Sequence, residues 1–221
     1  MRSGSRRAWL AVLLLSGWSR IGGITAQVAH QHHPESILEY IRALEDPERD
    51  AWQRPAQVIE KLALKPGDSV ADLGAGSGYF TVLLARTVGP AGKVYAIDIE
   101  PQMLEHIRQR AKQEKLTNIQ TVLADPHDPK LPQTSVDMIF ICDTLHHISE
   151  RSTYYPLLAR ALKPGGRLVD VDFQKRDLPI GPPLSMKIAK GGVVKEVAAA
   201  GFHLANDFDF LEYQYFLVFT R

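Results

Sequence analysis

The sequence predicts an α/β fold, with a doubly wound, mostly parallel sheet that carries helices on both faces. Short apolar runs rich in β-branched residues alternate with helical segments between residues 69 and 200, and this alternation is typical of parallel strands joined by crossover helices. Two further strand-like runs, 202–210 and 213–219, end the chain and are joined by a short turn. The chain has 221 residues, of which 45% are hydrophobic, and this suits one globular domain with an adequate core.

A glycine-rich turn follows the first predicted strand. Its sequence is Val70-Ala71-Asp72-Leu73-Gly74-Ala75-Gly76-Ser77-Gly78-Tyr79-Phe80, which predicts a buried strand, a tight turn and a helix start. Glycines allow the backbone to adopt positive φ or to lie flat against a ligand, and the helix N-terminus then presents free N–H groups to a bound cofactor. The dinucleotide-binding fingerprint requires a further glycine at position 79, where this chain has Tyr79.

An acid also ends the next predicted strand. The strand 93–98 ends in Asp98, and a helix opens with Pro101 at its first position. A carboxylate at this point can accept two hydrogen bonds from the hydroxyl groups of a ribose. Glu100 is the alternative, but it falls in the first helical turn, where acids are common because they interact favourably with the helix dipole.

The pattern Asp-x-Gly-x-Gly-x-Gly resembles motif I of the S-adenosylmethionine-dependent methyltransferases with a Rossmann-like fold. Other segments resemble further motifs of this family in the right order: 93–104, 119–126, 135–148 and 161–169. The resemblance covers residues 50–220. It implies a seven-stranded sheet whose last strand is antiparallel, S-adenosylmethionine as the cofactor, and methyl transfer as the activity.

The resemblance also implies roles for residues at the strand ends. Asp98 matches the acid that binds the ribose, and Asp125 matches an acid that contacts the adenine amino group, although a plain turn carboxylate is an equal alternative. The loop after the fourth strand lies beside the transferable methyl group in this family. The cofactor-binding residues implied are Asp72, Gly74, Ala75, Gly76, Gly78, Asp98, Ile99, Asp125 and Cys142, and the candidate catalytic residues are Asp143, His146 and His147.

The acceptor is expected to be a small molecule. Methyl transfer from a sulfonium is an in-line displacement that depends mainly on positioning, and a base is needed only for some acceptors. Residues 34–62, which include Trp52, Gln53 and Pro55, and the loop 178–183 are expected to form the walls of the acceptor site.

Two other protein classes remain as alternatives, and a third is disfavoured. The segments 64–68 and 76–79 are similar to protein isoaspartate O-methyltransferases, a protein carboxyl class, but no counterpart of their substrate-loop serine is present. Arsenite methyltransferases need several cysteines, whereas Cys142 is the only cysteine of this chain. An exported protein that binds the cofactor without catalysing transfer is the remaining alternative.

No metal site is expected. Asp170 and Asp172 alternate along a strand and point to one sheet face, and with Asp143 they suggest a Mg²⁺ site like that of catechol O-methyltransferases. No asparagine follows to complete that set of oxygen ligands. A histidine cluster near the N-terminus lacks other ligand types and is expected to stay in water: His30, His32 and His33.

The N-terminal residues predict export. Three arginines precede an apolar run at 8–18, which is the order of a secretory signal and is too short for a comfortable membrane span. Ser5-Arg6-Arg7 resembles a twin-arginine signal, with Sec export, an uncleaved membrane anchor, or a misassigned start and a cytoplasmic protein as alternatives. The domain organisation expected is an export signal or anchor at 1–26, helices that cover the cofactor cleft at 27–62, and the catalytic domain at 63–221.

The charge balance argues against nucleic acid as a partner. The whole chain carries a net charge of +1, and residues 1–26 hold four arginines and no acids, so that the remainder carries −3. A mildly acidic protein has no electrostatic footprint for nucleic acid. The expected partner is therefore a small-molecule substrate, with membrane contact only through an uncleaved N-terminal segment.

Replacing both Arg6 and Arg7 by lysine should trap the precursor in the cytoplasm, because the twin-arginine route requires the arginine pair. Cell fractionation of the wild type and the double variant measures this. Unimpaired export of the variant would indicate the Sec route, and an unprocessed cytoplasmic wild type would exclude an export signal.

Overall fold

The computed structural model describes residues 36–221. The expected export signal, the first residues of the 27–62 segment and the cluster of His30, His32 and His33 lie outside the described residues. Among the residues described, no helix combines the length and the apolar character that crossing a membrane requires.

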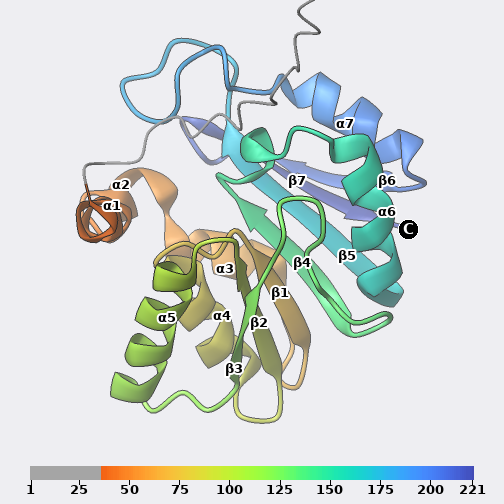
Figure 1. The fold of residues 1–221 in the computed structure, drawn as a ribbon. Coiled ribbons are helices and arrows are strands. Elements are labelled where there is room, and N and C mark those ends of the chain that lie inside the picture. The colour runs from red at the N-terminus through yellow and green to blue at the C-terminus, as the bar shows by residue number, and fades with distance from the viewer. Residues whose placement is uncertain (1–35) are drawn as a thin grey trace, which may run out of the picture. The chain divides into compact units, whose positions relative to one another are not determined.

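Seven strands form a single sheet in the order β3-β2-β1-β4-β5-β7-β6 (Figure 1). The pairs from β3 to β5 are parallel, and β7 runs antiparallel to both of its neighbours. The predicted fold class is therefore confirmed, including the antiparallel last strand. The strands are β1 (Ser69–Leu73), β2 (Lys93–Asp98), β3 (Ile119–Leu123), β4 (Val136–Cys142), β5 (Leu162–Phe173), β6 (His203–Phe208) and β7 (Gln214–Thr220).

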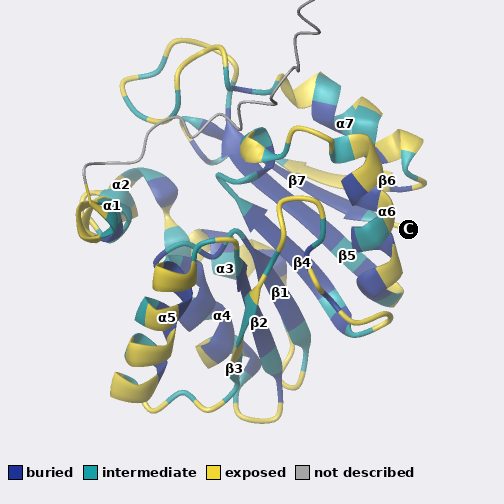
Figure 2. Cartoon of the chain, in the orientation of Figure 1, coloured by how far each residue is buried: buried dark blue, intermediate teal, exposed yellow. Residues whose placement is uncertain are grey.

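Helices cover both faces of the sheet, with α3, α4 and α5 on one face and α6 and α7 on the other (Figure 1). Because side chains alternate along a strand, each strand contributes to two cores: Val70 of β1 packs with α3 and α4, and Ala71 packs with α6. Figure 2 shows the buried strands between helices that are exposed on their outer sides. The helices are α1 (Ile37–Leu44), α2 (Arg49–Gln53), α3 (Pro55–Leu62), α4 (Tyr79–Val88), α5 (Pro101–Gln113), the 3₁₀ turn η1 (Leu145–His147), α6 (Arg151–Ala161) and α7 (Lys190–Ala199).

The strand order places the functional region. From β1 the sheet continues to β2 and β3 on one side and to β4 and β5 on the other. In open α/β sheets, ligands bind outside the carboxyl ends of the strands at this reversal point. The glycine turn after β1 and the loop after β4 therefore lie next to each other.

Three local features differ from expectation. Val58 and Leu62 are buried in the sheet core, so α3 is part of the packed body and does not close over the cleft as expected. Glu100 is the N-cap of α5, where its side chain accepts a hydrogen bond from the N–H of Gln102, and it does not lie in the first helical turn. The resemblance also implies a helix, a turn and a strand over 161–169, whereas β5 begins directly after α6 and contains an irregularity around Gly165.

Replacing Leu62 by alanine should lower the free energy of unfolding by about 2–5 kcal/mol, because it leaves a cavity in a fully buried position. Urea denaturation measures the change. Leu38→Ala is the control, since Leu38 is 61% exposed and its replacement should change stability by less than about 0.5 kcal/mol. Equally small effects of both substitutions would show that α3 is not part of the cooperative core.

Candidate functional site

The glycine turn has the left-handed backbone that its sequence predicts. Gly74 and Gly78 have φ of 75° and 80°, a region that disfavours side chains. A Cβ at Gly74 would lie 2.2 Å from Oγ1 of Thr144, and one at Gly78 would lie 2.8 Å from Cγ1 of Ile107. The N–H groups of Gly74 and Ala75 donate to the carbonyl of Ile97 at 2.8 and 2.9 Å. The turn is thus packed against β2, α5 and the loop after β4.

Asp98 lies beside this turn at the end of β2. Its Oδ2 accepts a hydrogen bond from the N–H of Gly76 at 2.8 Å, and its Oδ1 accepts one from the N–H of Glu100 at 2.9 Å. A carboxylate offers about four acceptor positions, so both oxygens keep capacity for ribose hydroxyls. Two exposed apolar side chains lie at the ends of β2 and β3: Ile99, which follows β2, is 56% exposed, and Leu123, the last residue of β3, is 54% exposed. A carboxylate acceptor beside apolar surface fits the ribose and adenine of S-adenosylmethionine.

Two other residues expected to bind the cofactor, Asp72 and Asp125, form hydrogen bonds with nearby residues of the chain. Asp72 is buried under the turn, where its Oδ2 accepts a hydrogen bond from Thr81 Oγ1 at 2.5 Å, and burial raises the pKa of Asp72 to about 7. It therefore links β1 to α4. Asp125 is exposed, and its Oδ1 accepts a hydrogen bond from the N–H of His127 at 2.9 Å, as in a plain turn.

The N-terminal helices lie across the glycine turn. We call residues 37–53, which comprise α1 and α2, the cover segment. A Cβ on Gly76 would be 3.1 Å from Leu44. Glu45 accepts hydrogen bonds from Arg110 at 2.9 Å and contacts His106 at 2.8 Å. Burial, followed by the charges of the Asp98 and Asp143 carboxylates, raises the pKa of Tyr40.

Asp143 follows β4 with a positive φ of 54°. Its Oδ1 accepts a hydrogen bond from Nε2 of Gln214 at 2.6 Å, and its Oδ2 lies 3.5 Å from Nη2 of Arg49. The neighbouring Cys142 places its Sγ 3.6 Å from Oδ2. Burial is the main cause of a raised Asp143 pKa, of about 6, which Arg49 partly offsets and Asp172 increases.

A network of side chains connects Asp143 to the cover segment. Gln53 donates from Nε2 to Oε1 of Gln214 at 2.7 Å, and its own Oε1 accepts hydrogen bonds from Nε and Nη2 of Arg49 at 3.3 and 3.1 Å. The Arg49 guanidinium also stacks over the Tyr79 ring at 4.2 Å. Arg49, Gln214 and Tyr40 are not predicted as site residues from the sequence. No local pattern marks them, since Gln214 and Asp143 are 71 residues apart.

His146 is paired with Asp172 of β5. Its Nδ1 lies 2.8 and 3.0 Å from the two carboxylate oxygens, and its backbone N–H donates to Oδ2 at 3.3 Å. Burial lowers the pKa of His146, but the hydrogen bond and charge of Asp172 outweigh this, and the net shift is upward. Because Nδ1–H faces the carboxylate, Nε2 is the free acceptor of the neutral ring.

His147 has different chemistry from its neighbour. Its ring lies 4.3 Å from that of His146. Burial and the adjacent His146 lower the pKa of His147 to about 4. It is therefore a neutral and weak base at physiological pH.

Asp170 points to the same sheet face as Asp172, as the strand alternation predicts. It is 1% exposed, and both of its oxygens lack hydrogen-bond partners, as do the buried hydroxyls of Tyr155 and Tyr215. Burial raises the Asp170 pKa well above its usual value. Within residues 36–221, no group of three or more His, Cys, Asp or Glu side chains is arranged to hold a metal ion.

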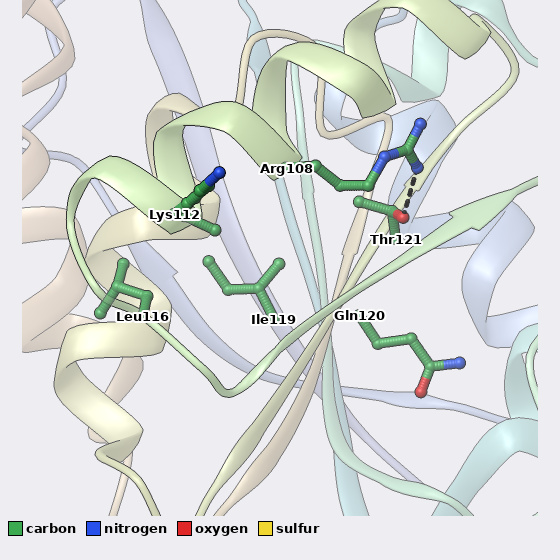
Figure 3. A pocket seen from close by; sticks show the side chains of 7 residues that line it. Arg108, Lys112, Leu116, Ile119, Gln120 and Thr121 are labelled. Atoms are coloured by element: carbon green, nitrogen blue, oxygen red, sulfur yellow. Dashed lines mark hydrogen bonds between the residues drawn. The ribbon is translucent and has the colours of Figure 1, made fainter.

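Two surface hollows lie outside the glycine turn. One lies between α5 and β3, where Arg108 donates a hydrogen bond to Thr121 beside Ile119 (Figure 3). No residue of the turn or of the loop after β4 lines it. The other is lined by residues that follow β5, including Gln174 and Arg176, by residues at the start of α7 and the end of β6, and by Gln214 and Tyr215 of β7. The second hollow therefore adjoins the network around Asp143.

A family model for the methyltransferase domain matches residues 64–201. The chain belongs to this family. A SAM-dependent methyltransferase from Aquifex aeolicus has a similar structure, with a TM-score of 0.78 and 28% identity over 82% of this chain and 97% of that one. These findings confirm the expected enzyme class, S-adenosylmethionine-dependent methyltransferases, and its cofactor.

Other relatives are similar to parts of this methyltransferase. The ubiquinone/menaquinone biosynthesis C-methyltransferase UbiE of Ectopseudomonas mendocina is 32% identical over 73% of this chain and 61% of its own length. The chain thus spans about three fifths of the curated relatives it matches. The [4+2]-cyclase SpnF shares the fold, with a TM-score of 0.65 and 17% identity over 77% of this chain and 81% of that one.

Replacing Asp98 by alanine should weaken binding of S-adenosylhomocysteine by about 1.5–3 kcal/mol, the scale of hydrogen bonds to a charged group. Titration calorimetry measures the affinity. Glu100→Gln is the matched control and should leave affinity nearly unchanged, because Glu100 caps its own helix. Full affinity in Asp98→Ala would contradict the ribose assignment.

Proposed function

We propose that this methyltransferase transfers a methyl group to a small, flat, hydroxylated aromatic acceptor by in-line displacement. The observation that carries the proposal is an aromatic wall next to the loop after β4. Trp52 of the cover segment packs against Phe173 at the end of β5, with ring centroids 5.7 Å apart. The Trp52 ring also lies 5.8 Å from the guanidinium of Arg49, which contacts Asp143. Aromatic rings favour offset or tilted packing with other rings.

The residues around Trp52 and Phe173 favour an acceptor whose aromatic ring carries hydroxyl groups. The amides of Gln53 and Gln214 are buried and hydrogen-bonded to each other and to Asp143, so they hold this carboxylate, itself a hydrogen-bond acceptor, near the wall. Gly181 packs closely on Phe173, since a Cβ there would be 2.6 Å from the ring. The relatives named as C-methyltransferases of ubiquinone and menaquinone biosynthesis are consistent with an aromatic acceptor.

His146 and Asp172 support a proton transfer in the proposed reaction. S-adenosylmethionine, when bound, supplies a methyl group activated by the sulfonium. An acceptor lone pair forms the new bond to the methyl carbon while the bond from that carbon to sulfur breaks and its electrons remain on sulfur. The acceptor proton passes to Nε2 of His146, and Asp172 stabilises the ring cation that forms. His146 is preferred to His147, whose pKa is too low for an effective base.

Purified protein with labelled donor should methylate members of a panel of phenols, catechols and hydroquinones. The panel should also contain amines, thiols and isoaspartyl peptides. Transfer to isoaspartyl peptides alone would contradict the proposal and favour the protein carboxyl class. Donor binding without transfer to any class would favour the non-catalytic alternative.

Replacing Asp172 by asparagine should move the pH profile of kcat/KM. His146 accepts a proton only when neutral, so the rate rises as pH increases through its pKa. Asp172 raises that pKa, so its loss should move the rise to lower pH and lower the plateau about 10²–10⁴-fold, because the ring loses its orientation.

His147→Gln is the control for this experiment. Since the pKa of His147 is about 4, its replacement should leave the position of the rise unchanged near neutral pH. A rise at the same pH in the wild type and Asp172→Asn would contradict the role of His146 as base.

A further inference from the structure

A long loop, residues 174–189, joins β5 to α7 and projects from the body of the sheet (Figure 1). We call it the β5–α7 loop. Its base is closed by Nζ of Lys187, which donates to the carbonyl of Arg176 at 3.0 Å, and Nη2 of Arg176 donates to the carbonyl of Glu212 at 2.8 Å. Further out, Gly181 packs on the ring of Phe173. The loop is therefore a compact unit whose tip is held in a defined position.

The tip of this loop is apolar and belongs to no core. Residues 178–184 read Leu-Pro-Ile-Gly-Pro-Pro-Leu and contain no polar side chain. Leu184 is 44% exposed, and Pro179 and Pro183 are exposed as well. Among residues 36–221, none of the hydrophobic clusters includes a side chain of this segment. A run of exposed apolar residues that the core does not use indicates a surface for contact with a partner.

Cationic residues flank the tip on both sides. Residues 175–190 hold one acid and four basic residues, which gives a local charge of +3. Residues 27–221 as a whole carry −3, so the part outside this stretch carries −6. The positive charge is thus concentrated around the apolar tip of an otherwise acidic protein. The four basic residues are Lys175, Arg176, Lys187 and Lys190.

This combination fits a lipid surface better than a protein surface. Stable protein interfaces are enriched in aromatic residues and depleted of lysine, whereas residues 174–190 contain three lysines and no aromatic residue. Binding at a membrane surface increases with the apolar area that is buried and with the attraction between basic residues and anionic lipids. Leu184 supplies the first of these terms, and Lys175 and its neighbours supply the second.

The backbone of the tip is also suited to a layer with little water. Unpaired N–H groups are costly where water is scarce, and proline has no N–H group. Pro179, Pro182 and Pro183 are three of the seven residues of the tip. The carbonyl of Pro183 accepts a hydrogen bond from the N–H of Met186 at 3.0 Å. The prolines therefore lower the cost of moving this backbone out of water.

We infer that the tip of the β5–α7 loop inserts into the surface of a membrane that contains anionic lipids, with the flanking cations at the headgroups. The base of the loop lines the second hollow, which adjoins the network around Asp143. Docking through the loop therefore brings that side of the site to the lipid surface. This contact is additional to the N-terminal one that the sequence predicts, and it does not depend on the identity of the acceptor.

Flotation of the full chain with vesicles tests the inference. The vesicles are an equal mixture of phosphatidylglycerol and phosphatidylcholine, with pure phosphatidylcholine for comparison. Leu184→Asp should weaken binding to the mixed vesicles about 10- to 100-fold, because it removes a buried leucine. Lys175→Gln should weaken it about fivefold, and added salt should weaken the wild type further.

Matched controls locate the contact. Leu204→Asp changes a leucine of β6 that is 41% exposed, and Lys65→Gln changes an exposed lysine that precedes β1, at the opposite edge of the sheet. Neither should alter vesicle binding. A polarity-sensitive dye on Ser185→Cys should shift to the blue with mixed vesicles, whereas the same dye on Gln109→Cys of α5 should not. Binding of S-adenosylhomocysteine to Leu184→Asp should equal that of the wild type, which shows that the variant is folded.

Several results would refute the inference. Vesicle binding that is the same in Leu184→Asp and the wild type would assign any membrane contact to the N-terminal residues, which all variants share. Equal losses in the loop variants and the controls would indicate attraction without a defined contact. A dimer without vesicles that Leu184→Asp dissociates, measured by ultracentrifugation, would show that a second copy of the chain covers the loop. None of these results depends on methyl transfer, so the proposed function stands or fails separately.

Discussion

The packing of the glycine turn against its neighbours is the constraint on which the site depends. Two N–H groups of the turn share the carbonyl of Ile97, and Gly74 leaves no room between its backbone and Thr144. Thr144 in turn donates to the carbonyls of Gly74 and Cys142, at 3.4 and 3.0 Å. The glycine turn after β1 and the loop after β4 are therefore fixed to each other. This rigidity suits a displacement in which positioning is the main requirement.

Several buried polar groups lie together at the carboxyl end of β5, on the sheet face that α6 and α7 cover. Asp172 has partners there, in the ring of His146 and the N–H of Phe173. Asp170 has none, and burial raises its pKa well above its usual value, which favours the neutral form. An unpaired buried charge would be far more costly than a neutral acid. The two carboxyl groups, two residues apart, therefore differ in environment, because only Asp172 has hydrogen-bonding partners.

The cover segment contacts both sides of the site, α5 on one side and β7 on the other. Glu45 binds it to Arg110 of α5, and Gln53 binds it to Gln214 at the start of β7. Arg54 follows with a left-handed φ of 48° immediately before Pro55, and its side chain donates to the carbonyl of Phe210. These contacts hold Arg49 and Trp52 of the segment beside Asp143 and Phe173, at the carboxyl ends of β4 and β5.

The sequence by itself determined the order of the elements, the glycine turn and the carboxylate of Asp98, because each depends on residues close together in the chain. It also placed Asp170 and Asp172 on one face through strand periodicity. The partners of Asp143 and His146 come from α2, β5 and β7, which only the folded sheet brings together. Tertiary structure alone also distinguished α3, which is packed in the core, from α1, which lies over the turn. Both helices are amphipathic, and an apolar face does not specify the surface against which it packs.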